Sequence, residues 1–374
     1  MKNYKYDFTA DLITKLVSSL KNNFGDENID KYRLSPLEVE NGKKYKPKEL
    51  LFSFAPGFFK KVFLKLYLKY SSYGPRLARL NRLYNTLSDE HSRMVLMEII
   101  AFSILNFKYV KLSVNTPEYW RSLDLIEKEA DKKTILKSNF RDMPFLLYDL
   151  SFINYDIKLH STAMAILVNF VNEQYAYKKN NTVIKVDPGD VVIEGGGCWG
   201  DTALYFATLA GESGRVYSFE FVGSNIDFFQ KNLSLNPKHK DQVEIVRHPL
   251  FDKKGIKMKF SDGGPGSRIF STEGQEEAVF VETQTIDDFV NEKNINKVDF
   301  IKLDIEGSEM KTLQGAVNTM RKFRPKLAIA VYHDIKDLYE IQEFIEKLDL
   351  GYKFYLDHFT IHWEETILFA VSEK

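Results

Sequence analysis

The chain of 374 residues exceeds the roughly 100–200 residues typical of one domain, which favours two domains over one. Hydrophobic residues make up 44% of it, which excludes a disordered chain, and 52 basic residues balance 52 acidic ones, so we expect no nucleic-acid partner. The single cysteine, Cys198, excludes an intramolecular disulfide. There is no recognisable secretory signal and no uncharged apolar stretch of roughly 18 residues, so we expect a cytoplasmic protein without membrane spans.

Residues 1–184 are expected to form a mainly helical region, because apolar side chains recur there at helical spacing. One part of this region is strongly basic, with eight lysines and one acid, Glu49, between 43 and 69. From Phe58 onward, apolar residues share one predicted helical face. Segment 43–70 therefore has two interpretations: an ordinary surface helix, or a peripheral contact with an anionic membrane.

The pattern changes near residue 185, where short apolar runs begin to alternate with helical stretches. The apolar runs are DVVIEG, RVYSFEF and QVEIVRH, and the helical stretches between them are GDTALYFATLA and SNIDFFQKNLSL. This βαβαβ order predicts parallel strands joined by right-handed crossovers, and hence a doubly wound α/β sheet. The later runs VDFIKLD and KLAIAVYH extend the sheet, and KFYLDHF and ETILFAV are expected to add a terminal antiparallel pair.

A glycine-rich loop at 194–200, with the sequence EGGGCWG, follows the first of these strands. It lies at the carboxyl end of that strand, where doubly wound sheets bind ligands. Glycines allow the backbone to approach a ligand closely. Glu220 ends the next strand, 20 residues after Gly200, and is well placed to accept hydrogen bonds from two ribose hydroxyls. Together these features predict an adenosine-type cofactor.

The loop leaves two cofactor classes open. The spacing Gly195-x-Gly197-x-x-Gly200 satisfies the dinucleotide fingerprint, so an NAD-dependent oxidoreductase is one alternative. Glu194 favours a methyl donor, because a carboxylate suits a sulfonium cation and its amino group but repels a pyrophosphate. The alternative interpretation of Glu194 is a surface acid at the end of a strand, but its place inside this loop favours cofactor binding. A non-catalytic glycan- or membrane-binding protein is a further alternative, which the presence of Glu220 and Asp304 disfavours.

Residues 185–372 carry a series of motifs that resembles the FkbM family of S-adenosylmethionine-dependent methyltransferases. The motifs, in order, are EGGGCWGDTALYFA, VYSFEFVGSN, DGGPGS, TIDDFV, VDFIKLDIEGSE and AVYHDIKDLYEI. The resemblance implies a Rossmann-like methyltransferase domain at 185–374 and methylation of a hydroxyl, often on a sugar or glycan. The chain departs from the family pattern at Glu194, where Asp is commoner, and at Cys198 and Trp199, where Asn is frequent. Residues 1–184 would then contact the acceptor or form a homo-oligomer interface.

The expected contacts of S-adenosylmethionine come from the loop, the helix after it and the ends of the next two strands. They are Glu194, Gly195, Gly196, Gly197, Cys198, Trp199, Gly200, Thr202, Glu220, Phe221 and His248. Segment 262–267 is expected to be a mobile loop over the acceptor, or simply a hairpin turn. Cys198 is not expected to act as a nucleophile, because no base is indicated next to it.

The catalytic candidates follow two later strands. Transfer of a methyl group to a hydroxyl depends on positioning the acceptor oxygen, and removal of its proton adds roughly 10²–10⁴-fold. His333 is the preferred base, because an unperturbed pKa of about 6.5 suits neutral pH, with a structural role as the alternative. Asp304 and Glu306 share one face, where they could bind Mg²⁺ or orient the acceptor hydroxyl. For Glu306 and Glu309 the alternative is capping of a helix, and the metal requirement stays open. Asp334 and Glu309 are further candidate bases.

Overall fold

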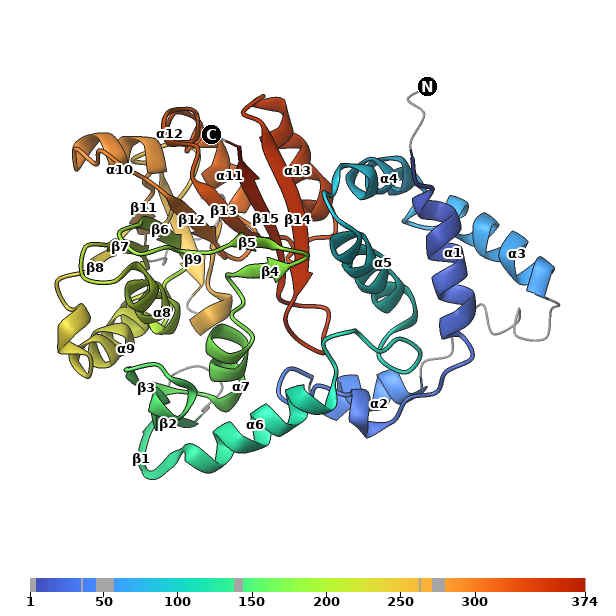
Figure 1. The fold of residues 1–374 in the computed structure, drawn as a ribbon, viewed down its shortest axis with the longest axis horizontal. Helices are drawn as coiled ribbons and strands as arrows, with labels where there is room; N and C mark the ends of the chain where they lie inside the picture. Colours follow the sequence, from blue (N-terminus) through green and yellow to red (C-terminus); the bar gives the residue numbers. More distant parts are fainter. Residues whose placement is uncertain are drawn as a thin grey trace.

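A computed structural model of the chain describes residues 5–34, 36–44, 57–137, 144–261, 264–270 and 280–373. Figure 1 shows a large sheet with helices packed against it and a group of N-terminal helices beside one of its edges. This is the α/β fold with a mainly helical N-terminal region that the sequence predicts.

The central sheet has seven strands in the order β14-β15-β13-β12-β6-β7-β8. They are β6 (Val191–Gly195), β7 (Arg215–Phe219), β8 (Val243–Val246), β12 (Phe300–Leu303), β13 (Lys326–Ala330), β14 (Tyr352–His358) and β15 (Thr366–Ser372). Strand β15 runs antiparallel to β13 and β14, whereas the other neighbouring pairs are parallel. The predicted doubly wound sheet with its antiparallel C-terminal strands is confirmed. Its order reverses between β6 and β12, and such a switch point opens a ligand crevice at the carboxyl ends of the strands.

Alternate residues of the parallel strands are buried in opposite layers, as the period of two in a strand requires. Val192 and Phe300 pack in one hydrophobic cluster with α8 and α9, and Ile193 and Ile301 pack in another with α10, α12 and α13. The helices are α8 (Asp201–Ala210), α9 (Gly223–Ser234), α10 (Ile286–Glu292), α11 (Glu309–Gln314), α12 (Val317–Phe323) and α13 (Asp337–Lys347). The sheet is therefore the middle layer of three.

The N-terminal helices extend one of these layers past the edge strand β14. They are α1 (Phe8–Ser19), α2 (Pro36–Lys44), α3 (Gly57–Tyr70), α4 (Leu77–Thr86), α5 (Glu90–Leu105) and α6 (Pro117–Glu129). Helix α5 begins after Asp89, whose side chain accepts a hydrogen bond from the Ser92 amide and so satisfies a free donor of the first turn. The Ser92 hydroxyl in turn accepts a 2.9 Å hydrogen bond from the Leu356 amide of β14. Buried side chains of α1, α4 and α5 belong to the same cluster as Ile193.

Residues 131–184 differ from the expected helical pattern. They form β1 (Asp131–Lys137), β2 (Pro144–Asp149), β3 (Lys158–Ser161), a short helix α7 (Ala163–Ile166), β4 (Tyr177–Lys179) and β5 (Thr182–Ile184). The prediction missed these strands because they are short and β1 is exposed along almost its whole length, which removes the alternation that marks a half-buried strand.

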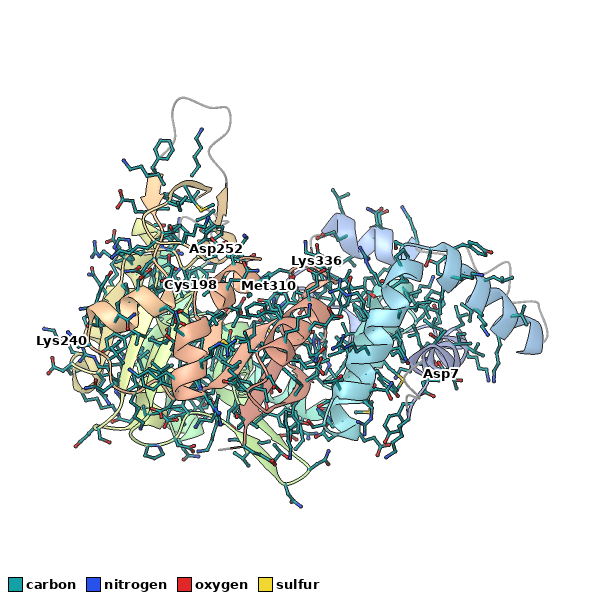
Figure 2. All side chains as sticks on the ribbon, turned by 90° about the horizontal axis from the view of Figure 1, so that it is seen from above. Asp7, Cys198, Lys240, Asp252, Met310 and Lys336 are labelled. Carbon is teal, nitrogen blue, oxygen red and sulfur yellow. The ribbon has the colours of Figure 1, made fainter. Side chains whose placement is uncertain are left out.

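A second small sheet is formed by β9 (Lys257–Ser261), β10 (Arg268–Phe270) and β11 (Phe280–Glu282), and Figure 2 shows it projecting from the body of the molecule. Strands β9 and β10 are antiparallel, so the predicted segment 262–267 connects them as a hairpin would. Its residues 262–263 lie outside the described part of the chain. Whether the turn moves over an acceptor stays a prediction.

The basic segment 43–70 is described only in part, because residues 45–56 fall outside the described ranges. Within α3, Leu64 and Leu68 are buried, whereas Val62, Leu66 and Tyr70 are exposed. Three residues of the predicted apolar face are therefore exposed, whereas Tyr67 of the same face packs against the core. Among the described residues, no helix combines the length and the apolar character needed to cross a membrane. Peripheral membrane contact stays a prediction.

Candidate functional site

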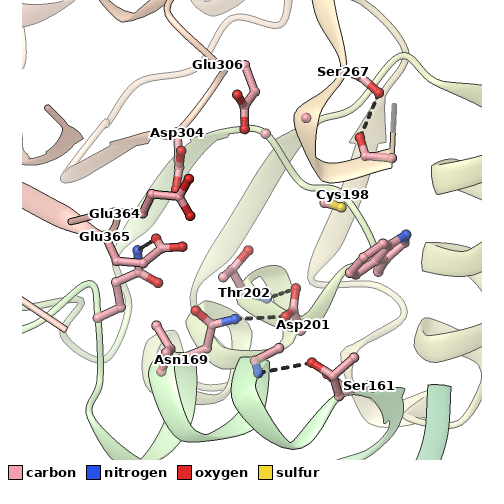
Figure 3. A pocket seen from close by; sticks show the side chains of 18 of the residues that line it. Ser161, Asn169, Cys198, Asp201, Thr202, Ser267, Asp304, Glu306, Glu364 and Glu365 are labelled. Carbon is pink, nitrogen blue, oxygen red and sulfur yellow. Dashed lines mark hydrogen bonds between the residues drawn. The ribbon is translucent and has the colours of Figure 1, made fainter. Parts of the chain in front are cut away.

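A cavity of about 1040 Å³ opens at the carboxyl ends of β6, β7, β12 and β13. In Figure 3, Cys198 and Thr202 lie on one side of it, and Asp304, Glu306, Glu364 and Glu365 lie on the other. The switch point in the strand order creates this opening, as expected for a doubly wound sheet.

The glycine loop contacts its surroundings too closely for larger side chains. Gly196 has a φ of +81°, and a Cβ atom there would lie 2.0 Å from the backbone oxygen of Asp304. Gly200 also has a φ of +81°, and its Cβ would lie 2.2 Å from the ring of Phe229. Both positions therefore require glycine, on grounds of conformation and of space.

Glu194 lies behind the loop and does not line the cavity. Its side chain is completely buried and accepts hydrogen bonds from the hydroxyls of Thr202 and, at 2.5 Å, of Ser218. Burial raises the pKa of this carboxyl, against the opposing effect of Lys302 and the two hydroxyls. We expected Glu194 to contact the cofactor, but the structure gives its carboxylate internal partners that fix the loop. Gly195, Gly197 and Gly200 are likewise absent from the cavity wall.

Lys302 is a site residue that the sequence analysis missed. It lies in β12 directly beside Glu194 of β6, and its side chain is 2% exposed. The Nζ atom donates a 2.7 Å hydrogen bond to the Gly196 oxygen and lies 3.7 Å from Glu194 Oε1. The available signal was a lysine inside an otherwise apolar strand, because a buried lysine needs a partner.

We expect Lys302→Met to lower the free energy of unfolding by about 3–5 kcal/mol, because it leaves the Glu194 carboxyl buried without its partner. The measurement is urea denaturation at neutral pH. Lys297→Met is the control, since Lys297 forms an exposed ion pair with Asp299, and we expect a loss below about 1 kcal/mol there. Equal losses for the two variants would contradict the structural role of Lys302.

Glu220 directs its carboxyl group into the cavity at the end of β7. Oε1 accepts hydrogen bonds from the amides of Phe221 at 2.7 Å and Val222 at 2.8 Å, and Oε2 accepts one from Asn225 at 3.2 Å. Burial raises the pKa of Glu220 to about 7, although these hydrogen bonds oppose the shift. The carboxyl is thus held rigidly where the sequence places a ribose ligand.

The other predicted cofactor residues that reach the cavity wall are Gly196, Cys198, Trp199, Thr202, Phe221 and His248. Burial raises the pKa of the Cys198 thiol well above its usual range, so this residue is a neutral thiol at neutral pH. The Trp199 ring packs edge-on against Phe145 of β2, with 4.4 Å between ring centroids. His248 Nδ1 lies 2.9 Å from the Glu282 oxygen, which connects the cavity wall to β11.

The predicted catalytic residues do meet at one end of the cavity. His333 Nε2 lies 3.5 Å from Asp304 Oδ1 and 3.7 Å from Glu306 Oε2. His333 Nδ1 lies 3.1 Å from Glu309 Oε1. Glu309 is the first residue of α11 and accepts a 2.8 Å hydrogen bond from the Ile305 amide, so it closes the turn before that helix. Asp334 does not line the cavity and pairs with Lys336 at 3.2 Å.

The carboxylates around His333 argue against its predicted role as the base. Burial by itself would lower the pKa of His333, but the neighbouring carboxylates of Glu306, Glu309 and Asp304 outweigh burial and raise the pKa to about 11. The ring is then an imidazolium at neutral pH and has no lone pair to accept a proton. The expectation relied on the unperturbed pKa, which the three neighbouring acids change.

Several further residues of the cavity were not foreseen. The hydroxyls of Tyr175 and Tyr332 each donate a 2.9 Å hydrogen bond to Asp304. Arg33, from the N-terminal region, lines the cavity and forms ion pairs with Glu364 at 2.8 Å and Glu365 at 2.7 Å. No local pattern marks Arg33, because its partners lie more than 300 residues further along the chain.

Residues 177–354 match the family model described as the methyltransferase FkbM domain. The resemblance to the FkbM family is confirmed over these residues, which form an FkbM methyltransferase domain. The match begins within β4, ahead of the predicted boundary at 185. No comparison supports the alternative of an NAD-dependent oxidoreductase, and a search of curated proteins found no match.

Solved structures resemble the chain at low sequence identity. The methyltransferase FkbM from Methylobacillus flagellatus KT is 16% identical, with a TM-score of 0.51 over 79% of this chain and 59% of its own. The chain thus spans less than two thirds of that protein. A fibrillarin from Aeropyrum pernix with natively bound S-adenosyl-L-methionine is 13% identical, with a TM-score of 0.33 over 64% and 98% of the two chains. A putative caffeoyl-CoA O-methyltransferase from Staphylococcus aureus is 10% identical, with a TM-score of 0.35 over 69% and 100%. The first of these shows a shared fold.

Proposed function

We propose that the chain transfers the methyl group of S-adenosylmethionine to a hydroxyl oxygen of a sugar or glycan. The observation that carries the proposal is a single cavity with the glycine loop and Glu220 at one end and the acidic group around Asp304 at the other. Cavities for drug-sized ligands measure roughly 300–1,000 Å³, so about 1040 Å³ leaves room for an acceptor beside the cofactor.

The residues of the FkbM domain fit this cofactor. Gly196 lines the cavity and has no side chain of its own, so its backbone would lie close to the cofactor. Glu220 presents a carboxyl that would bind the two ribose hydroxyls, and His248 and Phe221 would border the adenine. When bound, S-adenosylmethionine supplies a methyl carbon attached to a positively charged sulfur. The Glu194–Lys302 pair would keep the loop in place from behind, rather than contact the cofactor.

The acidic end of the cavity suits a polyhydroxylated acceptor. Glu306 lines the cavity, and its carboxylate would accept the hydrogen bond of the acceptor hydroxyl and then take its proton. The imidazolium of His333 would hold the neighbouring carboxylates in place. Tyr32 and Trp363 line the same cavity and are partly exposed, so their rings offer flat apolar surfaces to the faces of a sugar. In this proposal the N-terminal region contributes Tyr32 and Arg33 to the acceptor site.

The test is calorimetric titration of the purified chain with S-adenosylmethionine, S-adenosylhomocysteine and NAD, followed by transfer of labelled methyl groups to a panel of saccharides. We expect binding of the first two compounds and labelling of at least one saccharide. The matching deoxy-sugar, which lacks one hydroxyl, identifies the methylated position when labelling disappears. Binding of NAD alone would overturn the proposal, and labelling of an amine or thiol acceptor only would overturn its O-methyl part.

A further inference from the structure

Three side chains at the acidic end of the cavity are arranged as ligands of a metal ion. One ligand atom each from Asp304, Glu309 and His333 lies within 4.8 Å of the other two. They come from separate elements: Asp304 follows β12, Glu309 begins α11, and His333 follows β13. The order of the sheet places β12 beside β13, so the three side chains meet at one edge.

His333 gives a second, independent indication. Its side chain is 5% exposed, and neither ring nitrogen has a hydrogen-bond partner of acceptable geometry among the described residues. Buried polar atoms without partners are rare in proteins, and a bound ion is one of the ways in which such atoms are satisfied. Both nitrogens face carboxylate oxygens, at 3.1 Å from Glu309 and 3.5 Å from Asp304.

The negative charge of the two carboxylates also favours a bound cation. Among the described residues, neither Asp304 nor Glu309 pairs with a lysine or an arginine, and His333 is the ion-pair partner that the two share. The neighbouring lysine, Lys302, is engaged with Glu194 and the Gly196 oxygen. Buried carboxylates need a compensating cation. Without an ion, the imidazolium of His333 supplies that charge. A divalent ion that binds His333 releases the ring proton and compensates both carboxylates itself.

Outer contacts already orient the carboxylates, as they do around metal ligands in proteins. The hydroxyls of Tyr175 and Tyr332 hold Asp304 from two sides. The Ile305 amide holds Glu309 Oε1. Such contacts fix the direction of the remaining lone pairs. The side chains therefore lose little conformational entropy when an ion binds.

We propose that Asp304, Glu309 and His333 bind one divalent transition-metal ion at the acceptor end of the cavity. One imidazole with two carboxylates suits Mn²⁺ better than Mg²⁺, which prefers an all-oxygen shell. Asp304 and His333 line the cavity, so an open coordination position would face an acceptor hydroxyl. That last step rests on the proposed function, whereas binding of the ion does not.

The experiment is titration of chelator-treated full-length chain with Mn²⁺ in the absence of cofactor and acceptor, with free Mn²⁺ followed by electron paramagnetic resonance. We expect one ion bound per chain, and at least tenfold weaker binding by Glu309→Gln and by His333→Ala. Glu212→Gln, an exposed acid after α8, is the matched control and is expected to bind as the unmodified chain does. Circular dichroism of each variant verifies folding, and if His333→Ala does not fold, Glu309→Gln decides.

The outcomes separate the two proposals. Absence of stoichiometric Mn²⁺ binding by a chain that binds S-adenosylmethionine overturns the metal site and leaves the proposed function intact. Binding of Mn²⁺ that both variants retain also overturns it. A chain that binds Mn²⁺ at this site but does not bind S-adenosylmethionine supports the metal site and overturns the proposed function.

Discussion

Glu220→Ala is expected to weaken the binding of S-adenosylmethionine by about 100-fold. The substitution removes a carboxyl that would accept two ribose hydrogen bonds, and hydrogen bonds to a charged group contribute about 1.5–3 kcal/mol each. It also leaves the amides of Phe221 and Val222 without their acceptor. Calorimetry measures the change, and Asp227→Ala, an exposed acid on α9, is the control. A Kd within threefold of the unmodified chain would contradict the assignment of Glu220 to the cofactor.

The same carboxyl makes cofactor binding depend on pH. Burial raises the pKa of Glu220 to about 7, so the group gains a proton as pH falls through that value. The ionised form accepts both ribose hydrogen bonds, and we therefore expect the Kd to be nearly constant above about pH 8 and to rise by up to tenfold per pH unit below about 6. Glu220→Gln keeps the shape without the titration, so its binding should be weaker and flat over this range.

Gly196→Ala is expected to abolish detectable cofactor binding and to lower the free energy of unfolding by about 3 kcal/mol or more. The added Cβ would lie 2.0 Å from a backbone oxygen, and backbone cannot rotate away as a side chain can. The φ of +81° adds strain for any residue with a Cβ, of order 1–3 kcal/mol. Denaturation and calorimetry give the two quantities.

The control for this change is Gly223→Ala at the start of α9. No atom lies within 4 Å of the Cβ that this substitution would add. We expect its free energy of unfolding to lie within about 0.5 kcal/mol of that of the unmodified chain, and its affinity for S-adenosylmethionine to be unchanged. If Gly196→Ala behaves like this control, the close approach of the loop to Asp304 does not constrain the site.

Much of the sheet and of the cofactor end could be predicted because the signals are local. Apolar runs separated by polar turns mark the strands, and the position of a glycine loop after the first strand follows from chain order. The position of Glu220 at the cavity wall could be predicted for the same reason. The short strands at 131–184 were missed, because an exposed three-to-seven-residue strand carries no burial pattern to detect.

The acidic end could be predicted only as a set of candidates, because its chemistry depends on contacts between distant residues. His333 was assigned as a base from its intrinsic pKa, and the carboxylates that change this pKa lie 24 to 29 positions earlier in the chain. Lys302 meets Glu194 only because β12 lies beside β6 in register, which strand order decides and the local sequence does not. Arg33 needs the complete tertiary fold to reach Glu364.

The two walls of the cavity differ in how closely the surrounding structure constrains them. At Gly196 and Gly200 the loop after β6 leaves no room for a larger side chain, so few substitutions at these positions leave the loop intact. The opposite wall includes Tyr32 and Arg33, which precede the FkbM domain in the chain and lie on non-repetitive backbone between η1 (Asp26–Asn28) and α2. Under the proposed function, evolution can therefore change which acceptor is recognised by altering the N-terminal segment while the methyl-donor end is inherited unchanged.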